Sequence, residues 1–242
     1  MSNIITIKSI VVDTINTIQD NQYVLDSANP ITQNQWKDYG IDLNSFINNL
    51  MKIGFELVFV IGEFGTGKSF GMKTLVPKEF IWFNADLKNA SWKYTKEFAE
   101  AYGTKNDPKP FMKLPTTYKE IIKAVEVLKK GVDTKEGTIM LSADPVAFIL
   151  GHPEEYKVND YTKRRLRVLG KLAPKLGFEG KSSYTFYTRV EPNFKGQPSF
   201  YLTTQNSGYD TARSVEGVFD PVIPNDFQFI LNSIQNHNQN PY

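Results

Sequence analysis

The chain has 242 residues, of which 40% are hydrophobic and 22% charged, and its formal net charge is +2. This composition is typical of a folded globular protein, and the small net charge excludes binding to nucleic acid through overall charge alone. The absence of cysteine excludes disulfides and thiolate metal sites and fits a reducing compartment. No apolar run reaches the roughly 20 residues that span a bilayer, and the first residues are unlike a signal or transit peptide. We therefore expect a soluble cytoplasmic protein without membrane association.

The amino-terminal part of the chain combines a strand pattern with a helix pattern. Residues 7–14 (IKSIVVDT) are apolar and β-branched, which predicts a buried parallel strand closed by an aspartate. The polar stretch that follows contains Pro30 and Gly40 and is expected to form a loop. Asp42 is then expected to cap a helix that ends just before Gly54.

Two further strand patterns lie on either side of a glycine-rich turn. Residues 56–62 (ELVFVIG) predict a second buried strand, and residues 80–84 (FIWFN) predict a third. Between them, residues 67–75 predict a short helix that Pro77 stops. Residues 87–116 are rich in lysine, asparagine, glycine and proline, which indicates loops.

The second half of the chain changes from helix and strand to a β-rich pattern. Residues 117–131 (TYKEIIKAVEVLKKG) predict an amphipathic helix, and residues 146–152 (VAFILGH) predict a fourth strand. Residues 182–190 and 199–205 alternate in a way that predicts an antiparallel pair, while the Asn- and Gln-rich tail 232–242 is expected to fray. This order predicts an α/β fold: a mainly parallel sheet flanked by helices, with an antiparallel carboxy-terminal β extension.

Residues 62–69 (GEFGTGKS) match the phosphate-loop pattern GxxxxGK[ST] at every fixed position. In such a loop the glycines let backbone N–H groups turn toward phosphates, the lysine reaches the β- and γ-phosphates, and the hydroxyl binds Mg²⁺. A chance match in a glycine-rich turn is the alternative, but the strand before and the helix after the loop weigh against it. We therefore expect ATP and Mg²⁺ as ligands. The residues expected to contact the nucleotide are Gly62, Glu63, Phe64, Gly65, Thr66, Gly67, Lys68, Ser69 and Phe70.

The Mg²⁺ of such a site needs a second ligand, an aspartate at the end of a neighbouring apolar strand. Asp86 follows the third strand, directly after the loop's own helix. Asp144 is followed by Pro145 and another strand, which leaves no room for a crossover helix. Asp13 closes the first strand, and a loop and a helix lie between it and the next strand. We predict that Asp13 and Ser69 hold the metal; an aspartate that only caps a turn is the alternative.

Segments on both sides of the loop carry a resemblance to a known family. They are VVDTINTIQ (11–19), WKDYG (36–40), FILGHPEEY (148–156), KRRLRVLGKLAPKLGFEGKSSYTFYT (163–188) and YLTTQNSGYDTARSVEGVFDPVIPNDF (201–227). These segments resemble the phage-encoded RecA-like P-loop ATPases of the Sak type, which are linked to recombination by single-strand annealing. In that family the phosphate loop usually comes first and the acid strand in mid-chain. This chain therefore looks circularly permuted.

The resemblance implies a RecA-like fold, ATP hydrolysis and assembly into a homo-oligomer. It also implies that Asp86 polarises the attacking water, beside the phosphate-binding Lys68. His152 closes the strand that resembles the sensor strand, where it is a candidate for reading the γ-phosphate; a histidine satisfied by local hydrogen bonds is the alternative. Arg213, where the family tends to have lysine, is a candidate trans-acting finger that reaches the γ-phosphate of a neighbouring subunit.

A basic segment, Lys157–Lys175, contains Tyr161 and directly follows Tyr156. Cations interleaved with aromatic rings suit single-stranded DNA, and a solvated basic helix face is the alternative. The acidic pair Glu154 and Glu155 lies just before it, where solvation alone is the simpler interpretation. The basic residues of the segment are Lys157, Lys163, Arg164, Arg165, Arg167, Lys171 and Lys175.

Together these features predict an ATPase that couples hydrolysis of ATP·Mg²⁺ to the handling of single-stranded DNA in phage recombination or replication, in the host cytoplasm. A single-strand-binding protein is a candidate partner. The alternative is a nucleotide-binding structural or accessory phage protein with little or no turnover. A small-molecule kinase is disfavoured, because no Arg-rich lid follows the loop. We expect one domain over residues 1–242, whose parts are the acid strand and helix (1–54), the phosphate loop to the sensor strand (55–152), the basic and β-rich part (153–235) and the tail (236–242).

Overall fold

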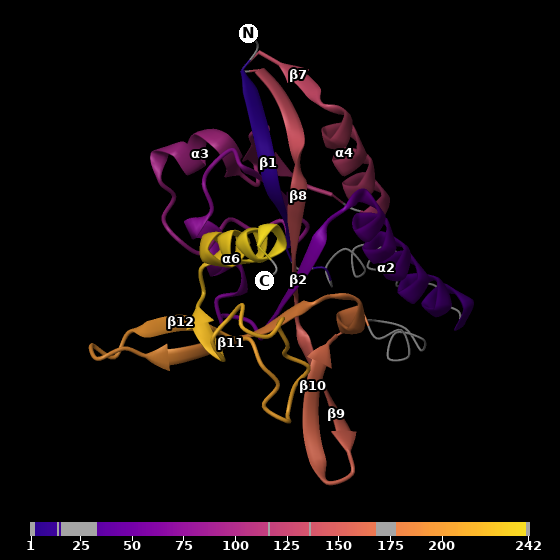
Figure 1. Cartoon of the computed structure of the whole chain (residues 1–242), viewed down its shortest axis with the longest axis vertical. Coiled ribbons are helices and arrows are strands. Elements are labelled where there is room, and N and C mark those ends of the chain that lie inside the picture. The colour runs from indigo at the N-terminus through magenta and orange to yellow at the C-terminus, as the bar shows by residue number, and fades with distance from the viewer. Residues whose placement is uncertain are drawn as a thin grey trace.

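A mixed, mostly parallel sheet forms the centre of the molecule, with helices on both of its faces (Figure 1). The computed structural model describes residues 3–13, 15, 33–115, 117–135, 137–167 and 178–240, and for residues 33–42 and 178 the backbone alone. The fold class is therefore α/β, as the sequence predicts.

Within these described residues, nine strands form the main sheet. They are β1 (Ile4–Asp13), β2 (Glu56–Ile61), β3 (Phe80–Asn84), β6 (Met112–Lys113), β7 (Val132–Thr134), β8 (Gly137–Gly151), β11 (Tyr184–Pro192), β12 (Pro198–Thr203) and β13 (Val222–Pro224). Their order is β13-β12-β11-β2-β8-β1-β3-β6, with β7 paired to β8. All neighbours from β11 to β6 are parallel. Strands β11 and β12 form the predicted antiparallel pair, and β13 adds a further antiparallel strand to it.

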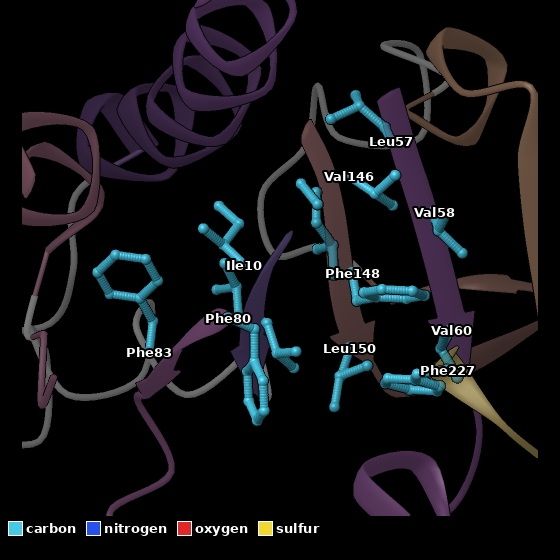
Figure 2. Close-up of a cluster of buried hydrophobic side chains, with 14 of the residues drawn as sticks. Ile10, Leu57, Val58, Val60, Phe80, Phe83, Val146, Phe148, Leu150 and Phe227 are labelled. Atoms are coloured by element: carbon cyan, nitrogen blue, oxygen red, sulfur yellow. The ribbon is translucent and has the colours of Figure 1, made fainter. Parts of the chain in front are cut away.

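The central strands are apolar runs because both of their faces are covered. Val58 and Val60 on β2 and Phe148 on β8 are fully buried. Figure 2 shows the ring of Phe148 facing that of Phe227, and the two ring centroids lie 4.4 Å apart in a stacked arrangement. This pair joins the middle of the sheet to the carboxy-terminal helix.

The helices divide between the two faces of the sheet (Figure 1). One face carries α2 (Gln33–Ile53) and α4 (Tyr118–Lys130), and the other carries α3 (Lys96–Tyr102), α6 (Phe227–Gln239) and the 3₁₀ helix η1 (Lys68–Thr74). A second 3₁₀ turn, η2 (Phe178–Lys181), precedes β11. The predicted amphipathic helix is confirmed as α4, and Thr117 and Glu120 form a capping box at its start.

Two helix predictions need correction. The helix that ends before Gly54 begins at Gln33, so Gly40 and Asp42 lie inside it and Asp42 is not its cap. The end is as predicted, because Gly54 takes the left-handed φ of 110° that stops a helix. The tail does not fray at residue 232: α6 continues to Gln239, since its apolar side chains lie at helical spacing and are buried.

The segments that were expected to be loops contain regular structure. Residues 87–116 include α3 and the short strands β4 (Gly103–Thr104), β5 (Asp107–Pro108) and β6. The described part of the basic segment, for which a helix face was the alternative, belongs to a two-stranded hairpin. Its strands are β9 (Pro153–Val158) and β10 (Tyr161–Leu166), and the hairpin projects beyond the sheet (Figure 1). Residues 16–32 and 168–177 lie outside the described residues, so the predictions that fall there are untested.

Candidate functional site

The carboxyl ends of the parallel strands meet at one edge of the sheet, which is where ligands bind in open α/β sheets. Asp13 ends β1 and is the register partner of Asn84, which ends β3. The glycine-rich loop, Gly62–Ser69, begins directly after β2, and Gly62 N–H donates to the carbonyl of Gly151 at the end of β8. Because β8 lies between β2 and β1, the predicted acid and the loop are separated by one strand and share this edge.

The glycine-rich loop has a backbone that requires its glycines. Gly65 and Gly67 have left-handed φ values of 76° and 85°, which residues other than glycine rarely adopt. At Gly62 the neighbouring β11 approaches so closely that a Cβ would overlap the hydroxyl of Thr188. That hydroxyl donates to Thr66 Oγ1 over 2.6 Å, which ties the loop to β11.

The helix after the loop is braced by the carboxy-terminal part of the chain. Asn225 Nδ2 donates to the carbonyl of Gly67 over 2.6 Å, and a Cβ at Gly71 would overlap the ring of Phe227. Asn225 belongs to the PND segment, where Asp226 accepts from Phe229 N–H and caps α6. Since η1 is a short 3₁₀ helix, its position depends on this packing more than on its own hydrogen bonds.

Lys68 is buried at the centre of the site, with only 8% of its surface exposed. Its Nζ donates to the carbonyl of Glu63 at 2.9 Å and lies 3.3 Å from Nδ1 of His152. Burial lowers the pKa of Lys68 to about 8, and the negative charges of Asp13, Glu63 and Asp86 oppose that shift. The ammonium group is therefore held in an environment that favours an incoming anion.

His152, directly after β8, contacts the lysine through its ring nitrogen. Burial and then the charge of Lys68 lower the pKa of His152 to about 4, so the ring is neutral at pH 7. Because the ammonium group donates, Nδ1 accepts and the ring proton is assigned to Nε2. The ring of Phe64 lies over the imidazole with its centroid 4.1 Å away. His152 thus faces the lysine directly, and its proposed reading of a phosphate stays a prediction.

The acids of this edge lie on two strand ends. Asp13 is buried, and Asp86, after β3, pairs with Lys88 at 2.7 Å. Both carboxylates act on the charge of Lys68. Asp144 lies elsewhere, at an irregularity within β8, which is one continuous strand from Gly137 to Gly151. In the described part of the chain, no three His, Cys, Asp or Glu side chains gather into a group that could hold a metal ion.

Two further nucleotide-contact candidates lie in the first turn of η1. Ser69 is half-buried and directly follows Lys68, and its role as a metal ligand stays a prediction. The ring of Phe70 packs against that of Phe200 on β12 with centroids 4.6 Å apart, and Lys73 Nζ lies 3.4 Å from the Phe70 centroid. Phe70 therefore joins η1 to the β extension.

Arg213 is engaged within its own chain. Its backbone pairs with Thr185 on β11, and its guanidinium donates to the carbonyls of Glu179 (2.6 Å) and Ser182. These bonds give Arg213 a role in holding η2 against β11. Its trans-acting role stays a prediction, and the structure gives it no support.

The β9–β10 hairpin arranges the described part of the basic segment on two faces. Tyr156, Tyr161 and Lys163 alternate onto one face together with Arg165, whose guanidinium carbon lies 4.6 Å from the Tyr156 ring centroid. Arg165 also pairs with Glu154 across the hairpin at 2.6 Å, so that acid has a structural partner. At the base of the hairpin, Arg167 N–H donates to the carbonyl of His152, and Lys171 and Lys175 lie outside the described residues.

Several residues of the site escape sequence reasoning. Four residues reach this edge of the sheet from other segments of the chain: Thr188, Asn225, Asn84 and Lys88. No short motif marks Thr188, Asn84 or Lys88. Asn225 had a signal, since it belongs to the PND segment, but its contact with Gly67 follows only from the packing of α6.

Comparison of the chain with known proteins finds no relative. No family model matches the chain, and neither a curated protein nor a solved structure matches it. Among the described helices, none is both long and apolar enough to cross a membrane. Function is therefore argued from the geometry of the site.

Proposed function

We propose that the chain is a RecA-like P-loop ATPase that binds ATP with Mg²⁺ and couples its hydrolysis to the handling of single-stranded DNA in phage recombination or replication. The observation that carries the proposal is the shared edge of the sheet. The buried Lys68 of the glycine-rich loop feels the charge of Asp13, which ends β1, and β1 is separated from β2 by β8 alone. Because parallel strands keep their ends together whatever their chain order, a permuted chain is compatible with this function.

The donor set of the edge fits a nucleotide with its metal. The loop backbone and Lys68 would hold the phosphates, and Lys68 has a lowered pKa that an anion would restore. Mg²⁺ in nucleotide sites is bound through one or two carboxylates together with phosphates and water, and Asp13 and Ser69 would supply the protein ligands. When bound, Mg²⁺ would neutralise charge on the phosphates. Asp86 would orient water, and His152 would sense the terminal phosphate.

The hairpin supports single-stranded DNA as the partner. Tyr161 is 61% exposed, and it shares its face with Tyr156, Lys163 and Arg165. Exposed rings beside cations suit stacking on bases together with neutralisation of phosphates. The hairpin starts directly after His152, so its base adjoins the proposed nucleotide site, while Tyr161 lies at its far end. Assembly into a homo-oligomer, and contact with a single-strand-binding protein, belong to the same proposal.

A second candidate is a nucleotide-binding accessory protein with little turnover. Two observations favour it. The carboxylate proposed to orient water, Asp86, is paired with Lys88, and the proposed finger Arg213 is bonded inside its own chain. Such a protein would use ATP to stabilise its fold or its assembly.

The deciding experiment is an ATPase assay with and without single-stranded DNA, on the wild type and on Asp13→Ala. The proposal expects turnover that DNA stimulates and that Asp13→Ala reduces by about a hundredfold or more. ATP binding with negligible turnover in both conditions would instead support the accessory role. Absence of ATP binding would refute both.

A further inference from the structure

The turn after β3 is held in place by a buried amide. Asn84 is fully buried, and its Nδ2 donates to the carbonyl of Lys88 over 2.7 Å. In return, Lys88 N–H donates to Asn84 Oδ1 over 3.4 Å. The side chain of Asn84 therefore fixes the backbone of Lys88 above the end of β3, level with Asp13 on the neighbouring strand.

The same turn contains an unfavourable backbone conformation. Leu87 has a left-handed φ of 51°, and its side chain is 42% exposed, so the conformation is not explained by burial of the leucine. Its neighbours Asp86 and Lys88 form an ion pair at 2.7 Å. Strained residues of this kind often occur at functional sites, where they hold neighbouring groups in place.

Lys88 reaches the glycine-rich loop from this turn. Its Nζ lies 5.7 Å from the ring centroid of Phe64, and Lys68 Nζ lies 5.6 Å from the same centroid. Two ammonium groups from different strand ends thus converge on one exposed ring. The charge of Lys88 also lowers the pKa of both Lys68 and His152. Two positive charges that act on the same edge of the sheet together favour a bound anion there.

We propose that Lys88 is a second phosphate-binding residue, whose ammonium group contacts the terminal phosphate of a bound nucleoside triphosphate from within the same chain. This inference rests on the proposed function, because it requires a nucleotide at Lys68. The ion pair with Asp86 and the hydrogen bonds between Asn84 and the Lys88 backbone position the lysine before the nucleotide binds. A cation supplied by the same chain can stabilise the terminal phosphate without a finger from a neighbour, which fits the engagement of Arg213 with its own backbone.

The test measures binding of ATP and of ADP separately by calorimetry in the presence of Mg²⁺. Because Lys88 is assigned to the terminal phosphate, Lys88→Met should weaken ATP binding about tenfold or more and leave ADP binding unchanged. Lys88→Arg keeps the charge and should retain most of the preference for ATP. Lys96→Met is the matched control: it removes the charge of a lysine that is 85% exposed on α3 and should change neither affinity.

The outcomes separate this inference from the proposed function. If wild type binds ATP and Lys88→Met binds both nucleotides like wild type, the role of Lys88 is wrong and the proposed function stands. An equal loss of ATP and ADP binding would also overturn the terminal-phosphate assignment. If wild type binds neither nucleotide, or Lys68→Met binds both normally, the proposed function itself fails.

Discussion

Lys68 illustrates how a binding residue lowers the stability of the protein that carries it. Its pKa is about 8 in the fold against 10.5 for an ordinary lysine, so at pH 7 it is charged in both folded and unfolded chains. In the folded state the charged ammonium group is buried, and loss of hydration makes the charged form less favourable. A tenfold weaker binding of the proton corresponds to about 1.4 kcal/mol. The contacts with Glu63 and His152 help to hold the Lys68 ammonium group in its buried position.

We therefore predict that Lys68→Met stabilises the protein without ligand by about 1–2 kcal/mol at pH 7, measured by urea denaturation. The unfolded chain binds the lysine proton more tightly, so wild-type stability should rise with pH between 8 and 10.5. The advantage of Lys68→Met should shrink over that range. Lys96→Met, whose charge is exposed, serves as the control and should have almost no effect. A destabilised Lys68→Met would contradict the lowered pKa.

The same lysine gives nucleotide binding a pH dependence. Only the charged form attracts phosphate, and a bound phosphate raises the pKa of Lys68 again. ATP affinity should be constant below pH 8 and fall up to about tenfold per pH unit above it. Titration calorimetry in buffers of different ionisation enthalpy should detect proton uptake on binding above pH 8. An affinity that stays constant up to pH 10 would mean that Lys68 keeps its charge in the free protein.

At the scale of elements, the glycine-rich loop is positioned by segments that follow it by more than a hundred residues. Asn225, which lies just before the cap of α6, donates to the carbonyl of Gly67, and Phe227 of α6 fills the space beside Gly71. Strand β11 contributes Thr188 to Thr66. A short 3₁₀ helix has poor hydrogen-bond geometry of its own, so these outer contacts set where η1 starts and hence where Ser69 lies.

Asn225→Ala should therefore weaken both folding and nucleotide binding. The variant leaves the carbonyl of Gly67 without this donor, and we expect a loss of about 1 kcal/mol in the free energy of unfolding. ATP affinity should fall as well, because the loop is less well held before binding. Asn236→Ala, on the exposed side of α6, is the control and should change neither quantity. If ATP affinity is unchanged while stability falls, the brace supports the fold alone.

At the scale of the whole molecule, the sequence predicted the features that a short pattern encodes. The apolar strands are confirmed, as in β2. They could be predicted because a strand that is buried on both faces needs a continuous run of apolar residues. The placement of Asp13 at the same edge as the loop follows from parallel strands. The start of α2 was missed because Gly40 and the polar residues around it are weak helix formers. The hairpin was missed because its charged residues do not alternate with apolar ones. Lys88 carries no pattern, since its position depends on Asn84 and on the φ of Leu87.

The hairpin offers a test of the whole molecule's proposed partner, because its two faces differ in chemistry. Tyr161 lies on the aromatic face and its neighbour Thr162 on the opposite one. If single-stranded DNA stacks on the aromatic face, Tyr161→Ala should weaken binding by about 1–3 kcal/mol with little change in salt dependence. Lys163→Ala should instead reduce the slope of affinity against salt by about 0.7, as expected for one lost phosphate contact.

Thr162→Ala is the matched control, since it shortens an exposed side chain on the other face of the same strand. Fluorescence anisotropy with labelled oligonucleotides over a range of salt concentrations separates the stacking contribution from the charge contribution. Equal affinities for Tyr161→Ala and Thr162→Ala would show that the aromatic face is not the stacking surface. DNA binding that Lys163→Ala leaves unchanged at every salt concentration would exclude this face from phosphate contact too. Together these two results would remove the hairpin from the proposed DNA site while leaving the nucleotide site untouched.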